Sequence, residues 1–181
     1  MRKACFLDRD GVINVEVCYL HEPEKTELIP GITEALKKLR AAGYLAIVVT
    51  NQAGVAKGIF PEEDIARTHA RIVELLAAEG AAVDDFFYCP HHPDYTGDCD
   101  CRKPAPGMII EAARKWNIDL GASFLIGDRL SDIFAGRNAG LADEYLVMTG
   151  YGATAVQNPE AATVTKAENP LDAVIDFLSK H

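Results

Sequence analysis

The sequence predicts an α/β fold in which a central parallel sheet carries helices on both faces. Short apolar runs alternate with amphipathic helical patterns along most of the chain, which is the order of repeated β-α units. The apolar runs are nearly continuous, as expected for strands that are covered on both faces. Of the 181 residues, 49% are apolar and 25% are charged, a composition that allows a sizeable core. We therefore expect residues 1–181 to form one domain.

Five apolar runs are predicted to be the strands of this sheet. They cover residues 4–7, 44–50, 86–89, 124–127 and 145–148. Two longer connections, residues 12–30 and 90–106, interrupt the alternation of strands and helices. Long irregular loops in compact domains often carry function, so these two segments are candidates for a binding site.

Amphipathic helices are predicted between the strands and at the carboxyl end. The first should stop at Gly43, the second should begin near Pro61, and the last should be capped by Asn169 ahead of Pro170. Apolar residues at helical spacing are predicted to face the core. They are Ile32, Ala35, Leu36 and Leu39; Ile65, Ile72, Val73 and Leu76; Ile109, Ala112, Ala113 and Trp116; and Leu171, Val174, Ile175 and Leu178.

The net charge and the amino terminus narrow the possible partners and location. A formal charge of −9 argues against nucleic acid and anionic membranes, because binding to phosphate backbones depends on many lysines and arginines. A short apolar run follows Met1-Arg2-Lys3, with no signal-peptide pattern and no run long enough to span a membrane. We expect a cytoplasmic monomer that binds a small phosphorylated ligand.

Two aspartates directly follow the first predicted strand. Asp8 and Asp10 lie two residues apart, with Arg9 between them, and Gly11 allows the chain to turn after them. Aspartate is also a common turn residue, so this pair alone does not define a site. In an open α/β sheet, however, ligands bind at the carboxyl ends of the strands. The two aspartates therefore indicate a catalytic site only if suitable partner residues also follow the other predicted strands.

Such partners follow three later segments. Thr50, Asn51 and Gln52 end the second strand and offer groups that could hold phosphate oxygens. Arg102 and Lys103 precede a helix, Asp128 follows the fourth strand, and Asp132 lies at the start of the next helix. Taken separately, each group has a simpler explanation. The residues after the second strand could be an ordinary polar end of a strand, Arg102 and Lys103 could be a surface pair of cations, and Asp132 could interact with the helix dipole. Together with Asp8 they predict a phosphate site with Mg²⁺, which prefers one or two carboxylates plus phosphate oxygens.

The second long connection contains an unusual group of cysteines and histidines. Three of the five cysteines fall within residues 89–101, which in a chain without a secretory signal favours metal binding over disulfides. Three thiolates and one imidazole suit a closed tetrahedral zinc site, although the Cys-x-His and Cys-x-Cys spacings are tighter than usual. The candidate ligands are Cys89, Cys99 and Cys101 with either His91 or His92.

The ordered set of these motifs resembles the haloacid dehalogenase (HAD) superfamily of phosphohydrolases. Within it, the chain resembles the D-glycero-D-manno-heptose 1,7-bisphosphate 7-phosphatase family. The matching segments are residues 8–14, 50–52, 89–93 and 99–104, and the region after Tyr151 is least diagnostic. The resemblance implies a Rossmann-like HAD fold that lacks a separate cap domain and carries a zinc-binding loop.

The resemblance also implies a role for each matching residue. Asp8 would be the nucleophile and Asp10 the general acid and base, while Thr50, the Asn51 amide and Lys103 would hold the transferring phosphate. Mg²⁺ would be bound by Asp8, the Asp10 carbonyl and Asp128. Structural Zn²⁺ would be bound by Cys89, His91, Cys99 and Cys101. The substrate residues implied are Asp8, Arg9, Asp10, Glu16, Val17, Cys18, Tyr19, Thr50, Asn51, Gln52, Ala53, Arg102, Lys103 and Arg129, with Arg102 also assigned to the catalytic set.

The function predicted first is removal of the C7 phosphate from a heptose bisphosphate. Histidinol-phosphate phosphatase is the closest alternative, because it shares the same motifs and a similar zinc loop. A nucleic-acid end phosphatase is disfavoured by the acidity of the chain. A phosphosugar-binding module without catalysis is disfavoured by the intact set of Asp8, Asp10, Lys103 and Asp128.

Overall fold

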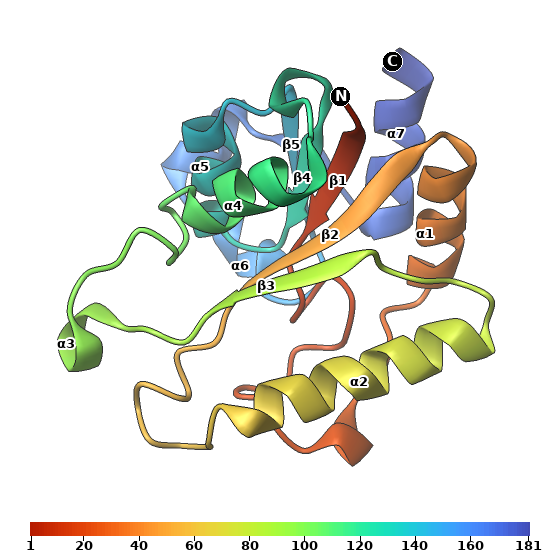
Figure 1. The fold of residues 1–181 in the computed structure, drawn as a ribbon. Helices are drawn as coiled ribbons and strands as arrows, with labels where there is room; N and C mark the ends of the chain where they lie inside the picture. Colours follow the sequence, from red (N-terminus) through yellow and green to blue (C-terminus); the bar gives the residue numbers. More distant parts are fainter.

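Six parallel strands form one sheet in the computed structural model, which describes residues 1–181 (Figure 1). The strands are ordered β3-β2-β1-β4-β5-β6. They span Lys3–Leu7 (β1), Tyr44–Asn51 (β2), Asp85–Cys89 (β3), Phe124–Gly127 (β4), Asp143–Val147 (β5) and Thr165–Ala167 (β6). The predicted α/β class is confirmed. The strand β6 was not predicted, because three half-buried or exposed residues give no apolar run.

The helices cover both faces of the sheet. One face carries α1 (Ile32–Ala41), α2 (Glu63–Ala78) and α7 (Pro170–Lys180), and the other carries α4 (Gly107–Trp116) and α5 (Leu130–Ala139). Shorter helical turns are η1 (Pro23–Lys25), α3 (Pro93–Thr96), η2 (Leu120–Ala122), α6 (Gly152–Ala155) and η3 (Pro159–Thr163). No separate cap domain is inserted, since residues between β1 and α1 form only a turn, two bridges and η1.

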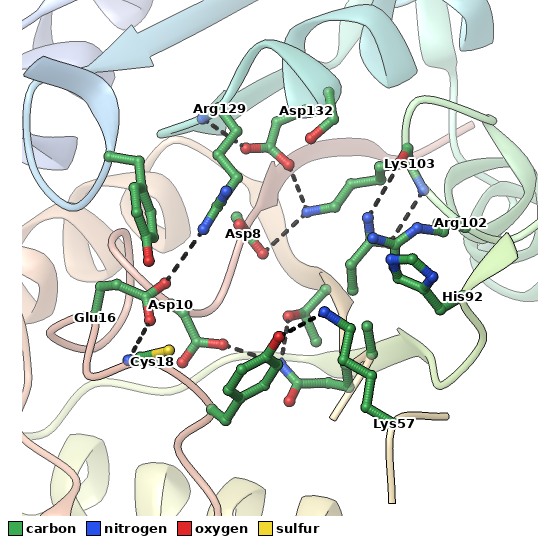
Figure 2. Close-up of a pocket in the computed structure, with 17 residues that line it drawn as sticks. Asp8, Asp10, Glu16, Cys18, Lys57, His92, Arg102, Lys103, Arg129 and Asp132 are labelled. Carbon is green, nitrogen blue, oxygen red and sulfur yellow. Dashed lines mark hydrogen bonds and ion pairs between the residues drawn. The ribbon is translucent and has the colours of Figure 1, made fainter. Parts of the chain in front are cut away.

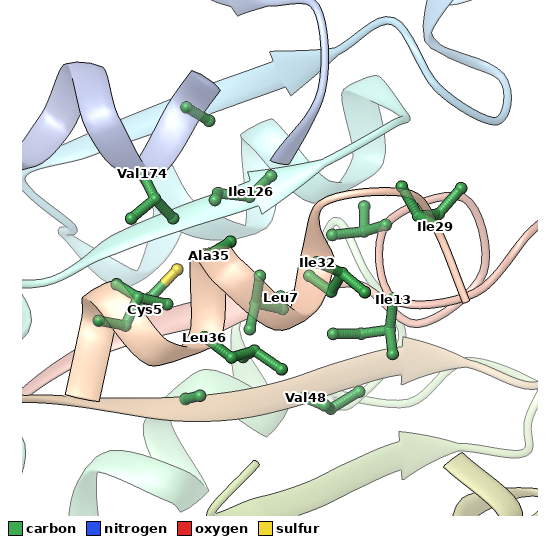
Figure 3. Close-up of a cluster of buried hydrophobic side chains, with 14 of the residues drawn as sticks. Cys5, Leu7, Ile13, Ile29, Ile32, Ala35, Leu36, Val48, Ile126 and Val174 are labelled. Atoms are coloured by element: carbon green, nitrogen blue, oxygen red, sulfur yellow. The ribbon is translucent and has the colours of Figure 1, made fainter. Parts of the chain in front are cut away.

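The core is divided by the sheet because successive strand residues point to opposite faces. In β1, Cys5 and Leu7 join the cluster under α1 and α7 (Figure 3), while Ala4 and Phe6 join the cluster under α4. Cys5 is therefore a buried core residue.

Two predicted core residues face solvent instead. Val73 and Ile175 each keep 46% of their surface exposed. In α2 the buried stripe runs through Thr68 and His69 to Ile72, and Val73 falls about 100° away from it. In α7 the inner face is formed by Val174 and Phe177, which displaces Ile175 outward. None of the helices combines the length and the apolar character needed to cross a bilayer.

Candidate active site and metal centres

Asp8 leaves β1 at the carboxyl edge of the sheet, where a tight turn begins. Its backbone amide still donates to the Ile126 carbonyl at 3.0 Å, so the ladder fixes where the side chain starts. Gly11 then adopts a left-handed conformation with φ +84°, which reverses the chain. Asp8 is only 7% exposed. The sheet therefore presents this carboxylate to a cavity from a rigid support (Figure 2).

Lys103 binds Asp8 from the side of the zinc loop. The Nζ of this buried lysine lies 2.9 Å from Asp8 Oδ1 and 2.6 Å from Asp132 Oδ1, and it donates to the Val49 carbonyl at 2.7 Å. Burial alone would lower the pKa of Lys103, but the charges of Asp132 and Asp8 outweigh it and raise the pKa well above its ordinary value. Lys103 is therefore a permanent cation at the nucleophile position.

The side chain of Asn51 holds the Lys103 backbone in place. Asn51 Nδ2 donates to the Lys103 carbonyl at 3.1 Å, and the Lys103 amide donates to Asn51 Oδ1 at 3.0 Å. Nearby, Gln52 Nε2 donates to Thr50 Oγ1 at 2.9 Å, and Thr50 is almost fully buried. The polar residues at the end of β2 thus fix the Lys103 backbone and the Thr50 hydroxyl by hydrogen bonds.

Three buried carboxylates meet beside Lys103. One oxygen each of Asp8, Asp128 and Asp132 lies within 4.8 Å of the other two. Burial, followed by their mutual repulsion, raises the pKa of Asp128 to about 8; for Asp8, burial outweighs the attraction of Lys103 and raises the pKa to about 7. Asp128 Oδ2 accepts from the Tyr151 amide at 2.7 Å, but Oδ1 is buried without a partner. Such an arrangement calls for a cation, because an unpaired buried carboxylate oxygen is costly.

Asp10 faces a different set of partners. Its carboxylate accepts hydrogen bonds from Arg9 Nη2 at 2.9 Å, Asn14 Nδ2 at 2.9 Å and Gln52 Nε2 at 3.0 Å. Burial would raise the pKa of Asp10, but the Arg9 charge and these donors together lower it. Asp8 and Asp10, two residues apart, therefore have pKa values displaced in opposite directions, which is a common property of acid-base pairs in active sites.

The cavity at this edge of the sheet has a volume of about 340 Å³ and is lined mainly by polar residues. Asp8, Asp10, Thr50 and Lys103 form part of its lining. Its rim is formed by Glu16, Tyr19, Lys57, Arg102, Arg129 and Tyr151. Arg129 lies over the Tyr151 ring at 3.6 Å and its Nη2 is 3.9 Å from Glu16 Oε2. The size and the polarity suit a small, highly charged ligand.

The predicted zinc ligands converge at the end of β3. The sulfur atoms of Cys89, Cys99 and Cys101 lie 2.8 to 3.5 Å apart, and His91 Nδ1 is 3.4 Å from Cys101 Sγ. Three thiols and one imidazole in a single cluster match a closed structural zinc site. His92 lies outside this cluster and lines the main cavity, and its Nδ1 accepts from the Asp94 amide and caps α3.

The zinc loop, residues 90–106, which follows Cys89 and carries the other predicted zinc ligands, is joined directly to residues that line the cavity. Arg102 Nη1 donates to the His91 carbonyl at 3.1 Å, and the Gln52 amide donates to the Cys89 carbonyl at 2.8 Å. Residues 90–98 are all exposed or half-buried, so this part of the loop has no core of its own. A metal at the cluster would therefore order both Arg102 and Lys103.

Comparison with known proteins gives the same assignment as the motifs. A family profile described as HAD-hydrolase-like matches residues 100–179. The D-glycero-beta-D-manno-heptose-1,7-bisphosphate 7-phosphatase of Pasteurella multocida is 44% identical over 83% of this chain and 84% of its own length. The D-glycero-alpha-D-manno-heptose-1,7-bisphosphate 7-phosphatase of Photorhabdus laumondii is 46% identical over 82% of this chain and 84% of its own. This chain belongs to the heptose 1,7-bisphosphate 7-phosphatase family. It is thus a member of the HAD superfamily.

A solved structure of the heptose bisphosphatase family matches nearly the whole fold. The D,D-heptose 1.7-bisphosphate phosphatase of B. bronchiseptica, complexed with magnesium and phosphate, has a TM-score of 0.89 and 33% identity, and the match covers 99% of both chains. In this chain the unpaired Oδ1 of Asp128 and the facing carboxylate of Asp8 supply the hard oxygen ligands that Mg²⁺ prefers. The residues present therefore fit the cation that the relative contains.

Twelve of the fourteen predicted substrate residues line one cavity, and two do not. The guanidinium of Arg9 is fully buried behind Asp10 and donates to the Leu20 carbonyl, so it orients Asp10 and does not face the ligand. Val17 lies in a neighbouring apolar hollow that Glu16 and Cys18 also line. The predicted residues found in the main cavity are Asp8, Asp10, Glu16, Cys18, Tyr19, Thr50, Asn51, Gln52, Ala53, Arg102, Lys103 and Arg129.

Three features of the site were not assigned by sequence reasoning. Asp132 was grouped with the site but given no role in it, and in the structure it pairs with Lys103 while its Oδ2 accepts from the Arg129 amide. Lys57 and Gly150 were not considered, because a single lysine or glycine in a loop gives no signal. Only the fold brings them to Tyr19 and Asp128, respectively.

Removing one zinc ligand should disrupt the site from a distance. We expect Cys101→Ser to lower the zinc content, which elemental analysis should give as about one zinc per wild-type chain. The loop that carries Arg102 and Lys103 would then be less ordered, and kcat/KM should fall by roughly tenfold or more. The matched control is Cys18→Ser, an exposed cysteine outside the cluster, which should keep the zinc. Full activity in a zinc-free Cys101→Ser protein would show that the metal does not order the site.

Proposed function

We propose that this chain removes the C7 phosphate of D-glycero-D-manno-heptose 1,7-bisphosphate and releases heptose 1-phosphate. The observation that carries the proposal is the buried Asp8 carboxylate held 2.9 Å from Lys103 and beside Asp128. A carboxylate with a fixed cation on one side and a cation-binding carboxylate on the other is suited to accept a phosphoryl group. The proteins of Pasteurella multocida and Photorhabdus laumondii are heptose-1,7-bisphosphate 7-phosphatases, and the similar solved structure is a heptose bisphosphate phosphatase.

In the first step, an Asp8 carboxylate oxygen attacks phosphorus. A new bond forms between this oxygen and phosphorus, and the bond between phosphorus and the C7 oxygen breaks. The departing oxygen takes a proton from Asp10. The three donors around Asp10 keep it ionised in the free protein, but a bound phosphate dianion raises its pKa because like charges disfavour the carboxylate. Substrate binding thus prepares Asp10 as the acid.

In the second step, Asp10 accepts a proton from water, and the resulting hydroxide attacks the aspartyl-phosphate. The bond between phosphorus and the Asp8 oxygen breaks, inorganic phosphate leaves, and the Asp8 carboxylate is restored. Arg9, Asn14 and Gln52 hold Asp10 in one orientation through both transfers. A single carboxyl group therefore serves as acid and then as base.

The developing charge on the phosphoryl oxygens is matched by groups already in place. Lys103 and the Thr50 hydroxyl lie at the cavity wall next to Asp8, and Asn51 fixes the position of Lys103. When bound by Asp8, the Asp10 carbonyl and Asp128, Mg²⁺ supplies positive charge that reduces the repulsion between the nucleophile and the phosphate. Because these groups are preordered, little reorganisation is needed during the reaction.

The charges at the cavity rim favour a bisphosphate over histidinol phosphate. Arg102 has no carboxylate partner, so the rim carries an unneutralised positive charge. A second phosphate on the substrate would be attracted there, whereas the ammonium group of histidinol phosphate would be repelled.

Steady-state phosphate release tests the proposal. The substrates are both anomers of D-glycero-D-manno-heptose 1,7-bisphosphate, together with histidinol phosphate, because the related phosphatases include both anomer specificities. We expect kcat/KM to be at least about 100-fold higher for one heptose anomer than for histidinol phosphate. A preference for histidinol phosphate would overturn the assignment.

A further inference from the structure

Lys57 reaches into the active-site cavity without a carboxylate partner. Its Nζ donates to the hydroxyl of Tyr19 at 2.8 Å, and the side chain lines the cavity beside Arg102. Figure 2 shows the amine entering from the side opposite Arg129 and Asp132. This lysine belongs to none of the motifs that define the nucleophile, the acid-base residue or the metal ligands. Its presence in a cavity of this kind therefore requires another explanation.

The other cations of the cavity have different partners. Lys103 lies between Asp8 and Asp132, and Arg129 lies 3.9 Å from Glu16. Arg102 donates to a backbone carbonyl only. The hydrogen bond to Tyr19 is the main cause that raises the pKa of Lys57, while the charge of Arg102 is among those that lower it. Lys57 and Arg102 thus form a small positive region that no carboxylate of the protein neutralises.

The backbone around Lys57 is held by packing on three sides. The amide of Lys57 donates to the Ala53 carbonyl at 3.1 Å, and the amide of Ala56 donates to the Pro90 carbonyl of the zinc loop at 3.2 Å. Phe60 closes the turn against Gly54, where a Cβ atom would lie 2.1 Å from the Phe60 ring. Lys57 is therefore presented by a packed turn tied to the zinc loop, which is the kind of support that binding residues need.

Tyr19 is directed at Lys57 by an uncommon backbone conformation. Cys18 and Tyr19 have φ values of 46° and 63°, in the left-handed region that residues with a Cβ rarely adopt. The Cys18 amide donates to Glu16 Oε1 at 2.7 Å, which helps to hold this conformation. Strained residues of this kind tend to occur at ligand sites. The neutral Tyr19 hydroxyl is a partner that an incoming phosphate oxygen can replace, since an ionic acceptor binds an ammonium more strongly.

We infer that Lys57 binds the second phosphate of the substrate, the one that is not transferred, beside Arg102, which the family resemblance already assigns to the substrate. Lys57 is then a specificity-determining residue that selects sugar bisphosphates over monophosphates. The inference rests on the proposed function. It deepens that function by assigning recognition of the distal phosphate to a lysine on the turn after β2.

A comparison of two substrates tests the role of Lys57. The first is heptose 1,7-bisphosphate, and the second is heptose 7-phosphate, which lacks the distal phosphate. The measured quantity is the ratio of kcat/KM for the bisphosphate to kcat/KM for the monophosphate. We expect Lys57→Met to lower this ratio by roughly tenfold or more, mainly through a higher KM for the bisphosphate. Lys57→Arg, which keeps the charge, should retain most of the ratio. Lys37→Met, at an exposed position on α1, should leave the ratio at the wild-type value.

The outcomes separate this inference from the proposed function. If Lys57→Met lowers kcat/KM for both substrates equally, so that the ratio stays at the wild-type value, Lys57 does not bind the distal phosphate and the inference is wrong. A melting temperature measured in parallel shows whether the variant is folded, and Lys57→Arg supplies the ratio if the methionine variant is not. If the wild-type protein itself does not prefer the bisphosphate, the proposed function fails and the inference falls with it.

Discussion

The variant Asp8→Asn is expected to lose phosphatase activity by roughly 10⁴-fold or more, because the amide is neutral and a poor nucleophile toward phosphorus. The fold should persist, since Asp132 remains as a partner for Lys103. Phosphate release from heptose 1,7-bisphosphate measures the loss. Asp143→Asn is the matched control, because this aspartate lies at the opposite end of a strand of the same sheet. Substantial activity in Asp8→Asn would refute its assignment as nucleophile.

The same variant should gain stability relative to the wild type as the pH rises. The folded pKa of Asp8 is raised from 3.8 to about 7, chiefly by burial. The folded protein therefore holds this proton more tightly than the unfolded chain does, and the stability that it contributes is lost as the pH rises from about 4 through about 7. Asparagine has no proton to lose. The melting temperature of Asp8→Asn minus that of wild type, measured without Mg²⁺, should increase from about pH 5 to about pH 8. A constant difference would show that folding does not raise the pKa of Asp8.

The parts of this molecule that follow from periodicity and from chain order were predictable from the sequence. The apolar runs of β1, β2 and β4 are visible because both faces of these strands are buried, and parallel pairing places their carboxyl ends at one edge. Asp8, Thr50 and Asp128 could therefore be grouped before their distances were known. The zinc cluster was predictable for a different reason, because its four ligands lie close together in the sequence as well as in space.

The parts that depend on tertiary packing were not predictable in this way. Asp132 was grouped with the site but given no partner, because the sequence does not show that Lys103 Nζ reaches it across the sheet edge. Arg9 was assigned to the ligand only through the family resemblance, but its fully buried side chain turns to Asp10 and to the Leu20 carbonyl. Lys57 reaches the cavity only through the turn that Phe60 and Pro90 hold. Each of these cases involves the direction of one side chain, which periodicity does not specify.

The second large effect is expected from the addition of a single methyl group at Gly150. The carboxylate of Asp128 lies between two glycines, Gly11 and Gly150, whose backbones come close together. A Cβ atom on Gly150 would be 2.1 Å from Asp128 Oδ2 and 2.8 Å from the Cα of Gly11, closer than real Cβ contacts allow. Asp128 is completely buried. In Gly150→Ala, Asp128 must therefore move from its place beside Asp8, and we expect the Mg²⁺ concentration for half-maximal activity to rise by roughly tenfold or more.

The variant Gly43→Ala is the control that separates the effect of this clash from the cost of the backbone conformation. Gly150 has φ +54° and Gly43 has φ +80°, so alanine is strained at both positions, but nothing lies within 4 Å of the Cβ position at Gly43. Gly43→Ala should lose about 1 kcal/mol of stability and keep its Mg²⁺ dependence. If Gly150→Ala behaves in the same way, backbone strain alone explains its defect. A Mg²⁺ dependence that shifts only in Gly150→Ala would show that the two glycines are needed because they leave room for a metal-binding carboxylate.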